Sequence, residues 1–360
     1  MIPTRIPMKK AHALNPERFR KEFQAIIESF VLERVRHSNV KNPVVKRLVK
    51  QSAAFALSPG KRIRPFLAYT ASTSSGANVT DAMMLGIALE LFHDFALVHD
   101  DIIDQSDLRR GKPSMHAYFE RLHIAERWRG DERRFGETFG ILSGDLLLTW
   151  SDLALKRVAS DAIHSNIAAL WDEMKEEVIL GQALDVALGS FRGLPSRQAV
   201  MHMLAVKSGR YSIGRPMLLG YALGGEIYDP EKIMSVAEPL GIAFQIQDDL
   251  LGVFSDPDAT GKSRSADIRE GKVTLLAYET IRRLEVSATK KSWDKAYGNP
   301  VATERQVAEA RRIIDESGAK RYVETLSAQL IELSITRSRG LPDGGAWFRQ
   351  FALWMQGRTS

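Results

Sequence analysis

The sequence predicts an all-α protein built as one domain. Apolar residues recur at helical spacing over long stretches, whereas alternating β-branched runs bounded by turn residues are nearly absent. The breaks between these stretches are short, as at Pro59-Gly60 and at Pro257. With 360 residues, of which 44% are hydrophobic, the chain can bury a large core. These observations favour a bundle of helices over a sheet.

The first helix is predicted to begin at Asn15 and Pro16, an N-cap followed by proline at the first helical position. Its apolar periodicity continues over 19–35. The same periodicity predicts further helices over 81–99, 141–158, 166–188, 200–223, 230–253, 273–284, 304–317 and 320–337.

The domain is expected to span residues 16–340, between an N-terminal arm at 1–15 and a C-terminal helix or tail at 341–360. Residues 121–137 are dense in charge and hold two glycines. They predict an exposed insertion between helices, and the sequence assigns it no role.

Composition excludes several classes of protein. There is no cysteine, which rules out a disulfide scaffold, thiolate zinc sites and cysteine catalysis. The first ten residues contain two prolines and three basic residues and lack the apolar run of a signal peptide. No stretch reaches the roughly 18 apolar residues of a transmembrane helix. We therefore expect a cytoplasmic protein.

Positive charge is concentrated at the start of the chain. The formal net charge is +6, and residues 1–50 hold twelve Lys and Arg against four Asp and Glu, so the other 310 residues carry −2. A nucleic-acid binder needs a cationic stripe tied to its fold, so no nucleic-acid partner is expected. A basic first helix suits anionic lipid or acidic substrates, and any membrane contact is expected to be peripheral.

Three aspartates crowd the end of one apolar helix, at Asp100, Asp101 and Asp104. Asp100 and Asp104 are four residues apart and share a helix face, where two carboxylates repel each other unless a cation lies between them. Carboxylates at a helix C-terminus also oppose the helix dipole. Mg²⁺ commonly takes one or two carboxylates and completes its shell with water and phosphate. The alternative reading of this motif alone is a solvated helix end.

A second acidic pair, Asp248 and Asp249, interrupts another apolar helix. Two such clusters in one helical chain predict a clamp for divalent metal. Cations that could neutralise a diphosphate accompany the acids at Lys61, Arg62, Arg64, Arg109, Arg110, Lys207, Lys262 and Lys272. His93 lies seven residues before Asp100 on nearly the same face, where a lone histidine is more often structural.

Several separated motifs resemble those of the trans-isoprenyl diphosphate synthases, or polyprenyl synthetases. They include GKRIRP at 60–65, LVHDDIID at 97–104 and FQIQDD at 244–249. Shorter similar segments occur in the family's order at 109–113, 144–145, 181–185, 207–208, 261–262 and 271–272. The resemblance covers about residues 20–335. It implies an antiparallel isoprenoid synthase-like bundle around a central apolar cavity, a homodimer, and condensation of isopentenyl diphosphate with an allylic diphosphate.

The resemblance also implies roles for individual residues. Asp100 and Asp104 would coordinate two Mg²⁺ ions and Asp248 a third, supported by Asp101 and Asp249. Isopentenyl diphosphate would be held by Lys61, Arg64, His93 and Arg110. The allylic diphosphate would be held by Arg109, Lys207, Lys262 and Lys272. The catalytic residues, which include those placing oxygen dipoles near the developing carbocation, would be Lys207, Ser208 and Gln245.

Two motif residues depart from the family pattern. Gly252 replaces the usual last aspartate of the second acidic motif, which puts the third metal in doubt. Ser208 replaces the usual threonine but keeps the hydroxyl.

Product length is expected to depend on the helix below Asp100, at Phe92, Phe95 and Ala96. In the family, one aromatic five residues before the first aspartate suggests a C20 product, geranylgeranyl diphosphate. Farnesyl and longer-chain synthases are the alternatives. Less favoured are a non-catalytic synthase subunit, which would lack these acids and cations, and a class I terpene cyclase, which needs no isopentenyl site.

Overall fold

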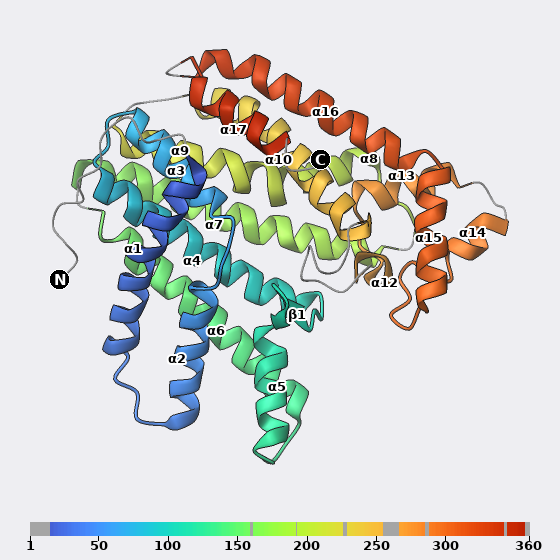
Figure 1. Ribbon diagram of the computed structural model, residues 1–360, viewed down its shortest axis with the longest axis horizontal. Helices are drawn as coiled ribbons and strands as arrows, with labels where there is room; N and C mark the ends of the chain where they lie inside the picture. Colours follow the sequence, from blue (N-terminus) through green and yellow to red (C-terminus); the bar gives the residue numbers. More distant parts are fainter. Residues whose placement is uncertain are drawn as a thin grey trace. The chain divides into compact units, whose positions relative to one another are not determined.

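The protein is all-α, as predicted, in the computed structural model (Figure 1). The structure describes residues 15–158, 161–191, 193–225, 229–254, 266–284, 288–341 and 344–356. These residues divide into two compact helical units. The first is drawn from Met1–Ile167 and Pro216–Ile227, and the second from Ala168–Arg215 and Tyr228–Ser360. The single domain over 16–340 and the central apolar cavity stay predictions.

The first unit is built around helix α4 (Val79–Ile103), which packs against α3 and α6. Its other elements are α1 (Pro16–His37), α2 (Pro43–Ala56), α3 (Ile63–Ser74), the hairpin β1 (Leu108–Arg109) and β2 (Lys112–Pro113), α5 (Met115–Ala125), α6 (Glu132–Leu155), and all of α9 (Arg215–Leu223) except Arg215. Asn15 caps α1 as predicted, because its side chain accepts hydrogen bonds from the backbone of Glu17 and Arg18.

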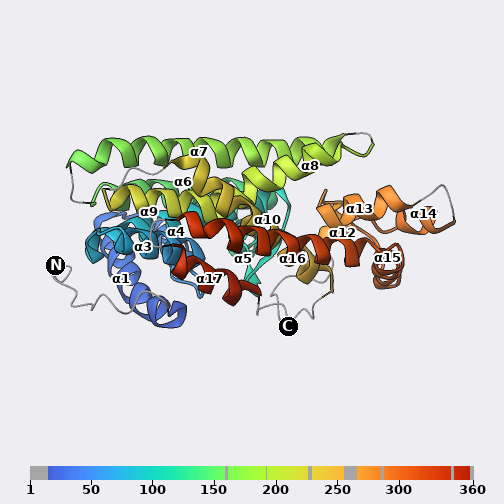
Figure 2. The same ribbon diagram turned by 90° about the horizontal axis from the view of Figure 1, so that it is seen from above.

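The second unit packs α10 (Pro230–Phe254) against α16 (Ala319–Arg337) and the π-helix η2 (Ala205–Gly214). Figure 2 shows α16 running beside α10, with α17 (Ala346–Gln356) next to it. The other elements are most of α7 (Asp161–Ser190), α8 (Arg197–Leu204), α12 (Ala266–Glu270), α13 (Leu275–Arg283), α14 (Ala288–Trp293), α15 (Glu304–Glu316) and η3 (Ser338–Gly340).

Two predicted segments differ in detail from the structure. The helix predicted over 200–223 is interrupted by ten residues of π-helix, η2, between α8 and α9. Residues 121–137 are not a separate inserted element, because they contain the end of α5, a turn and the first part of α6. Periodicity missed this hairpin because arginines and acids outnumber apolar residues there. Its tip is nevertheless packed, with the rings of Trp128 and Phe135 at 5.2 Å.

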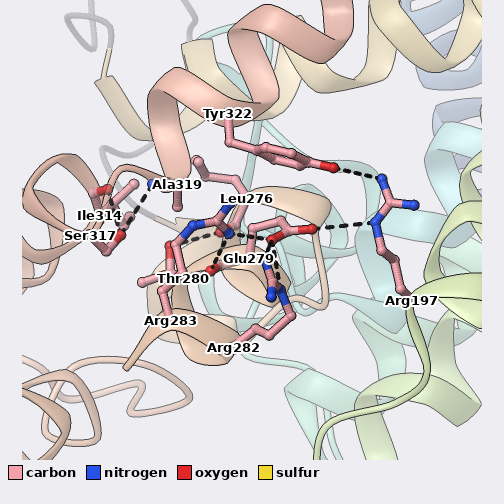
Figure 3. A network of polar contacts seen from close by, with 10 residues as sticks. All are labelled: Arg197, Leu276, Glu279, Thr280, Arg282, Arg283, Ile314, Ser317, Ala319 and Tyr322. Atoms are coloured by element: carbon pink, nitrogen blue, oxygen red, sulfur yellow. Dashed lines mark hydrogen bonds and ion pairs between the residues drawn. The ribbon is translucent and has the colours of Figure 1, made fainter. Parts of the chain in front are cut away.

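A buried carboxylate joins three helices of the second unit (Figure 3). Glu279 of α13 is 1% exposed and accepts hydrogen bonds from Arg282 and Arg283, one turn further along the helix, and from Arg197 of α8. Arg197 also donates to the hydroxyl of Tyr322 on α16 at 2.8 Å. Burial raises the pKa of Glu279, but the arginines outweigh it and the net pKa is lowered.

Helix α4 is the one described helix that is long and apolar enough to cross a membrane. In its most apolar 18-residue window, 78% is buried inside the protein, as in the core helix of a globular fold.

Candidate active site

The last turn of α4 presents two aspartates and buries a third. Asp104 is the C-cap, and its backbone N–H donates to the carbonyl of Asp100 at 2.8 Å. Asp101 is fully buried and accepts a hydrogen bond from Arg109 Nε at 2.8 Å. The Asp100 side chain is 21% exposed, and Asp104 is half-buried. The pair predicted to bind Mg²⁺ therefore keeps contact with solvent, whereas Asp101 is committed to Arg109.

The β1–β2 hairpin aims two neighbouring arginines in different directions. Arg109 Nη2 lies 3.7 Å from Asp100 Oδ2 in addition to its contact with Asp101. Burial lowers the pKa of Arg109, but Asp101, Asp100 and Asp104 outweigh it and raise the pKa. Arg110, in left-handed conformation with φ 54°, donates instead to Ser58 and lies over the ring of Phe55. Arg109 thus contacts the aspartates at the end of α4, whereas Arg110 contacts the loop before α3.

The loop before α3 is held by Arg62, which the sequence prediction counted among the cations for a diphosphate but which the structure buries. Arg62 is 2% exposed, has a left-handed φ of 52°, and donates to the carbonyls of Ala56 and Ser58 at 3.0 and 2.9 Å. It also pairs with the buried Glu90 of α4. Because Arg62 is fixed on both sides, it sets the positions of its neighbours in the motif, Lys61 and Arg64.

His93 is half-buried and lies among cations. Burial is the main reason that its pKa lies well below the ordinary value, and Arg64, Arg110, Arg109 and Arg62 lower it further. The imidazole is therefore neutral at pH 7. The structure thus brings together three of the residues predicted to hold isopentenyl diphosphate, His93, Arg64 and Arg110, in one cationic cluster.

Asp94, which the sequence prediction missed, lies beside the same arginines. It is fully buried, and its Oδ1 lies 3.7 Å from Arg110 Nη2. Asp94 and Glu90 are four residues apart within an apolar helix. Two acids at helical spacing in a core-like segment could have been recognised in the sequence as partners for the arginines of the GKRIRP motif.

In the second unit, a chain of hydrogen bonds joins the predicted catalytic residues. Ser208 Oγ donates to Gln245 Oε1 at 2.8 Å, and Gln245 Nε2 donates to Asp249 Oδ1 at 2.8 Å. Lys207 pairs with Asp185 of α7. Lys207 and Ser208 both lie in the π-helix η2, a conformation that is frequent at functional sites.

Asp249 lies in an acidic environment. Burial, the nearby Asp267 and, to a smaller extent, Asp248 raise its pKa, whereas Gln245 and Lys272 lower it. The net pKa is about 7. Asp267 is a second residue that the sequence prediction missed. A Cβ atom on Gly252 would lie 2.9 Å from Asp267 Oδ2, so this carboxylate borders the position of the missing aspartate. Lys262 lies outside the described residues.

The predicted product-length residues lie on two sides of α4. Phe92 and Phe95 are 0% and 8% exposed, with ring centroids 5.4 Å apart. Phe95 also contacts the ring of His99 at 4.8 Å. Ala96 is half-buried, like His93 and Asp100 on the same side of the helix.

The donor set fits Mg²⁺ that is completed by a ligand. Within the described ranges, no group of three or more His, Asp or Glu side chains could hold a metal by itself. Asp100 and Asp104 supply two carboxylates on one partly exposed helix end. This matches the preference of Mg²⁺ for one or two carboxylates with the remaining positions left to water and phosphate.

The chain is similar in sequence and structure to several known proteins. A geranylgeranyl diphosphate synthase from Sulfolobus acidocaldarius is 30% identical over 75% of this chain and 77% of its own length. A (2E,6E)-farnesyl diphosphate synthase from Mycobacterium bovis is 26% identical over 79% of this chain and 75% of its own. The crystal structure of geranylgeranyl pyrophosphate synthase from Corynebacterium glutamicum, complexed with isoprenyl diphosphate and magnesium, superposes with a TM-score of 0.86 at 29% identity. It covers 94% of this chain and 99% of that one.

The sequence profile of the polyprenyl synthetases matches residues 46–314, which include both acidic motifs and the GKRIRP segment. The alignment thus spans well over half of the chain and the residues whose geometry is described above. The protein belongs to the polyprenyl synthetase family.

Proposed function

We propose that this protein is a Mg²⁺-dependent trans-prenyltransferase that condenses isopentenyl diphosphate with allylic diphosphates, and that its main product is geranylgeranyl diphosphate. The observation that carries the proposal is the different exposure of the three aspartates at the end of α4. Asp100 and Asp104 remain partly exposed while Asp101 is buried against Arg109. A solvated helix end would not bury one acid against an arginine and leave its two neighbours presented.

The cationic cluster of Arg64, Arg110 and His93 supports an isopentenyl diphosphate site. His93 is neutral, so the positive charge that attracts a diphosphate comes from the arginines around it. Arg64 and Arg110 would pair with phosphate oxygens through their planar guanidinium groups. A class I terpene cyclase would have no use for this second anion site, which makes it the weaker alternative.

The allylic diphosphate would be bound by Arg109, Lys207, Lys262 and Lys272. Mg²⁺ held by Asp100, Asp104 and Asp248 would withdraw charge from the departing diphosphate. Ser208 and Gln245, oriented by their mutual hydrogen bond, would place oxygen dipoles beside the carbocation that forms as the allylic C–O bond breaks. The isopentenyl double bond then attacks this cation, and loss of a proton completes the product.

Several finer points belong to the same proposal. We infer about three Mg²⁺ ions, with Asp101 and Asp249 supporting the direct ligands. We also infer a homodimer and a cytoplasmic location, since the motifs match a family with these properties. Product length rests on Phe95 and Ala96, and a farnesyl or longer-chain synthase is the second candidate.

Product analysis tests the function directly. Purified protein would be incubated with Mg²⁺, labelled isopentenyl diphosphate and each allylic primer in turn, and the dephosphorylated products sized by chromatography. We expect label in a C20 alcohol and none when Mg²⁺ is chelated. Asp100→Ala and Asp104→Ala should abolish turnover and keep the wild-type melting temperature. Normal Mg²⁺-dependent turnover in either variant would contradict the metal assignment.

A second assay separates the two diphosphate sites. Arg64→Ala removes a charged bidentate contact worth about 2 to 3 kcal/mol, so KM for isopentenyl diphosphate should rise roughly 30- to 150-fold. KM for the allylic substrate should change little. The reverse pattern would mean that the two sites have been exchanged.

A further inference from the structure

The positive charge at the start of the chain is concentrated in one short segment. Residues 15–33, most of α1, hold three Lys and Arg against four Asp and Glu. Residues 34–50 hold six Lys and Arg and no Asp or Glu. The cationic surface is therefore the end of α1, the following loop and α2, which we call the basic end; its exposed cations are Arg36, Lys41, Lys46, Arg47 and Lys50.

Most of these cations have no acidic partner. Among the described residues, no carboxylate lies within 4 Å of Arg36, Lys41, Lys46 or Lys50. Lys46 and Lys50 are also four residues apart on the outer face of α2, where like charges destabilise a helix. The buried side of α2 is formed by Leu48, Val49 and Ala53. The charge therefore contributes nothing to packing, and it is free to attract an anionic surface.

Apolar side chains lie among these cations. Val45 of α2 is 37% exposed. Arg47 reaches Glu126, just after α5, at 3.0 Å, which brings the α5–α6 tip with its 56% exposed Ile124 beside α2. Figure 1 shows the α1–α2 turn and this tip at the same end of the first unit. Cations interspersed with exposed aliphatic side chains suit a lipid interface better than a nucleic-acid backbone.

We propose that the basic end docks the protein reversibly on bilayers that contain anionic lipid. The cations lie near the headgroups, and Val45 and Ile124 contact the acyl boundary. The interaction does not depend on the proposed reaction, although a prenyl diphosphate product has an apolar tail that partitions into the same membrane.

Vesicle sedimentation tests this surface without any substrate. Full-length protein would be mixed with vesicles of phosphatidylcholine alone or of phosphatidylcholine with phosphatidylglycerol, at low and high NaCl. We expect binding only to the anionic vesicles, and loss of that binding at high salt. Lys46→Glu with Lys50→Glu should weaken binding by about 30-fold or more, since each lysine near an anionic surface contributes about fivefold.

The matched control makes the same change in charge elsewhere. Lys291→Glu with Arg321→Glu alters two exposed cations of the second unit and should bind vesicles like the wild type. Both variants should keep wild-type prenyltransferase activity and melting temperature, because none of these residues belongs to the active site. Equal loss in both variants, equal binding to neutral vesicles, or tighter binding to an RNA oligonucleotide than to anionic vesicles would overturn the proposal.

Discussion

Arg110 of the β1–β2 hairpin lies over Asp94 of α4, with Nη2 and Oδ1 3.7 Å apart. The Asp94 carboxyl is fully buried, and neither of its oxygens accepts a hydrogen bond from the described residues. An ionised carboxylate is costly in such surroundings. Burial, reinforced by Glu90, raises the pKa of Asp94 well above its ordinary value against the opposing effects of Arg110, Arg62 and Arg64.

This raised pKa predicts a pH-dependent effect of Asp94→Asn on stability. The folded state binds the Asp94 proton more tightly than the unfolded state. The resulting stabilisation of the fold is fully present below the unfolded pKa of about 3.9, and it is lost as pH rises through the folded pKa. The amide is neutral at every pH. The free energy of unfolding of the variant minus that of the wild type should therefore increase by more than about 1 kcal/mol between about pH 5 and about pH 8.

Urea unfolding at the two pH values measures this gain. Asp315→Asn, at an exposed position on α15, is the control and should show no such gain. If Asp94→Asn loses stability by the same amount at both pH values, Asp94 is ionised throughout and acts as a plain ion-pair partner of Arg110.

A second prediction concerns the aspartate that the second acidic motif lacks. Gly252→Asp would place a carboxylate beside Asp267, in a cluster that already holds Asp248 and Asp249. Overpacking and like charge should lower the unfolding free energy by about 1 to 3 kcal/mol. Gly252→Ala should be close to neutral, because the Asp267 carboxyl can move away from a methyl group and alanine favours the helix.

Thermal melting with and without Mg²⁺ separates charge from size in this cluster. Mg²⁺ should raise the melting temperature of Gly252→Asp more than that of the wild type, since binding to the folded state stabilises it. Adding Asp267→Asn should recover most of the loss without metal. Equal melting temperatures for the alanine and aspartate variants would show that charge repulsion is absent.

The Glu279 network yields a third prediction. Its lowered pKa means that its contribution to stability is present above the unfolded pKa of about 4.3 and is lost as pH falls through the folded value. Glu279→Gln should cost about 2 kcal/mol at pH 7, the scale of a buried hydrogen bond to a charged group, and less in acid. Chemical unfolding of the wild type and of Glu279→Gln, from about pH 7 to about pH 3, would show whether their free energies of unfolding converge in acid.

The sequence predicted the helices well where apolar residues repeat over several turns, as in α4 and α10. It missed α2 and α5, because both are short, with 14 and 11 residues, and offer few turns over which an apolar period can repeat. The π-helix at Lys207 could not be foreseen, since its extra residue per turn leaves no clear apolar period. Local backbone geometry of this kind is set by packing against α10 rather than by side-chain order.

The acidic and basic motifs could be assigned from residue type and order, but their pairing could not. Asp100 and Asp101 are chemically identical neighbours, and only the fold directs one toward solvent and the other toward Arg109. Asp267 was missed for the same reason, because an acid in the short polar helix α12 gives no sign of its proximity to Asp249 until the fold is known.

The final prediction concerns product length. Ala96 is half-buried on the side of α4 that holds His93 and Asp100, which is where we predict that the growing prenyl chain lies. Ala96→Phe should shorten the product from C20 toward C15. Gly144→Ala tests the same region indirectly. Its Cβ would displace the ring of His99, which packs on Phe95, so the length of the product should change.

Phe95→Ala is the more demanding test. Phe95 is 8% exposed and packed between the rings of Phe92 and His99, so removing its ring should cost about 3 to 5 kcal/mol of stability and leave a cavity. If that ring is the floor, the cavity should admit one more isoprene unit, whose burial is favourable by about 0.8 kcal/mol per CH₂. Products longer than C20 from a folded variant would place the floor at Phe95. A folded, active variant that still stops at the wild-type length would place it instead at Phe92, one turn deeper in α4.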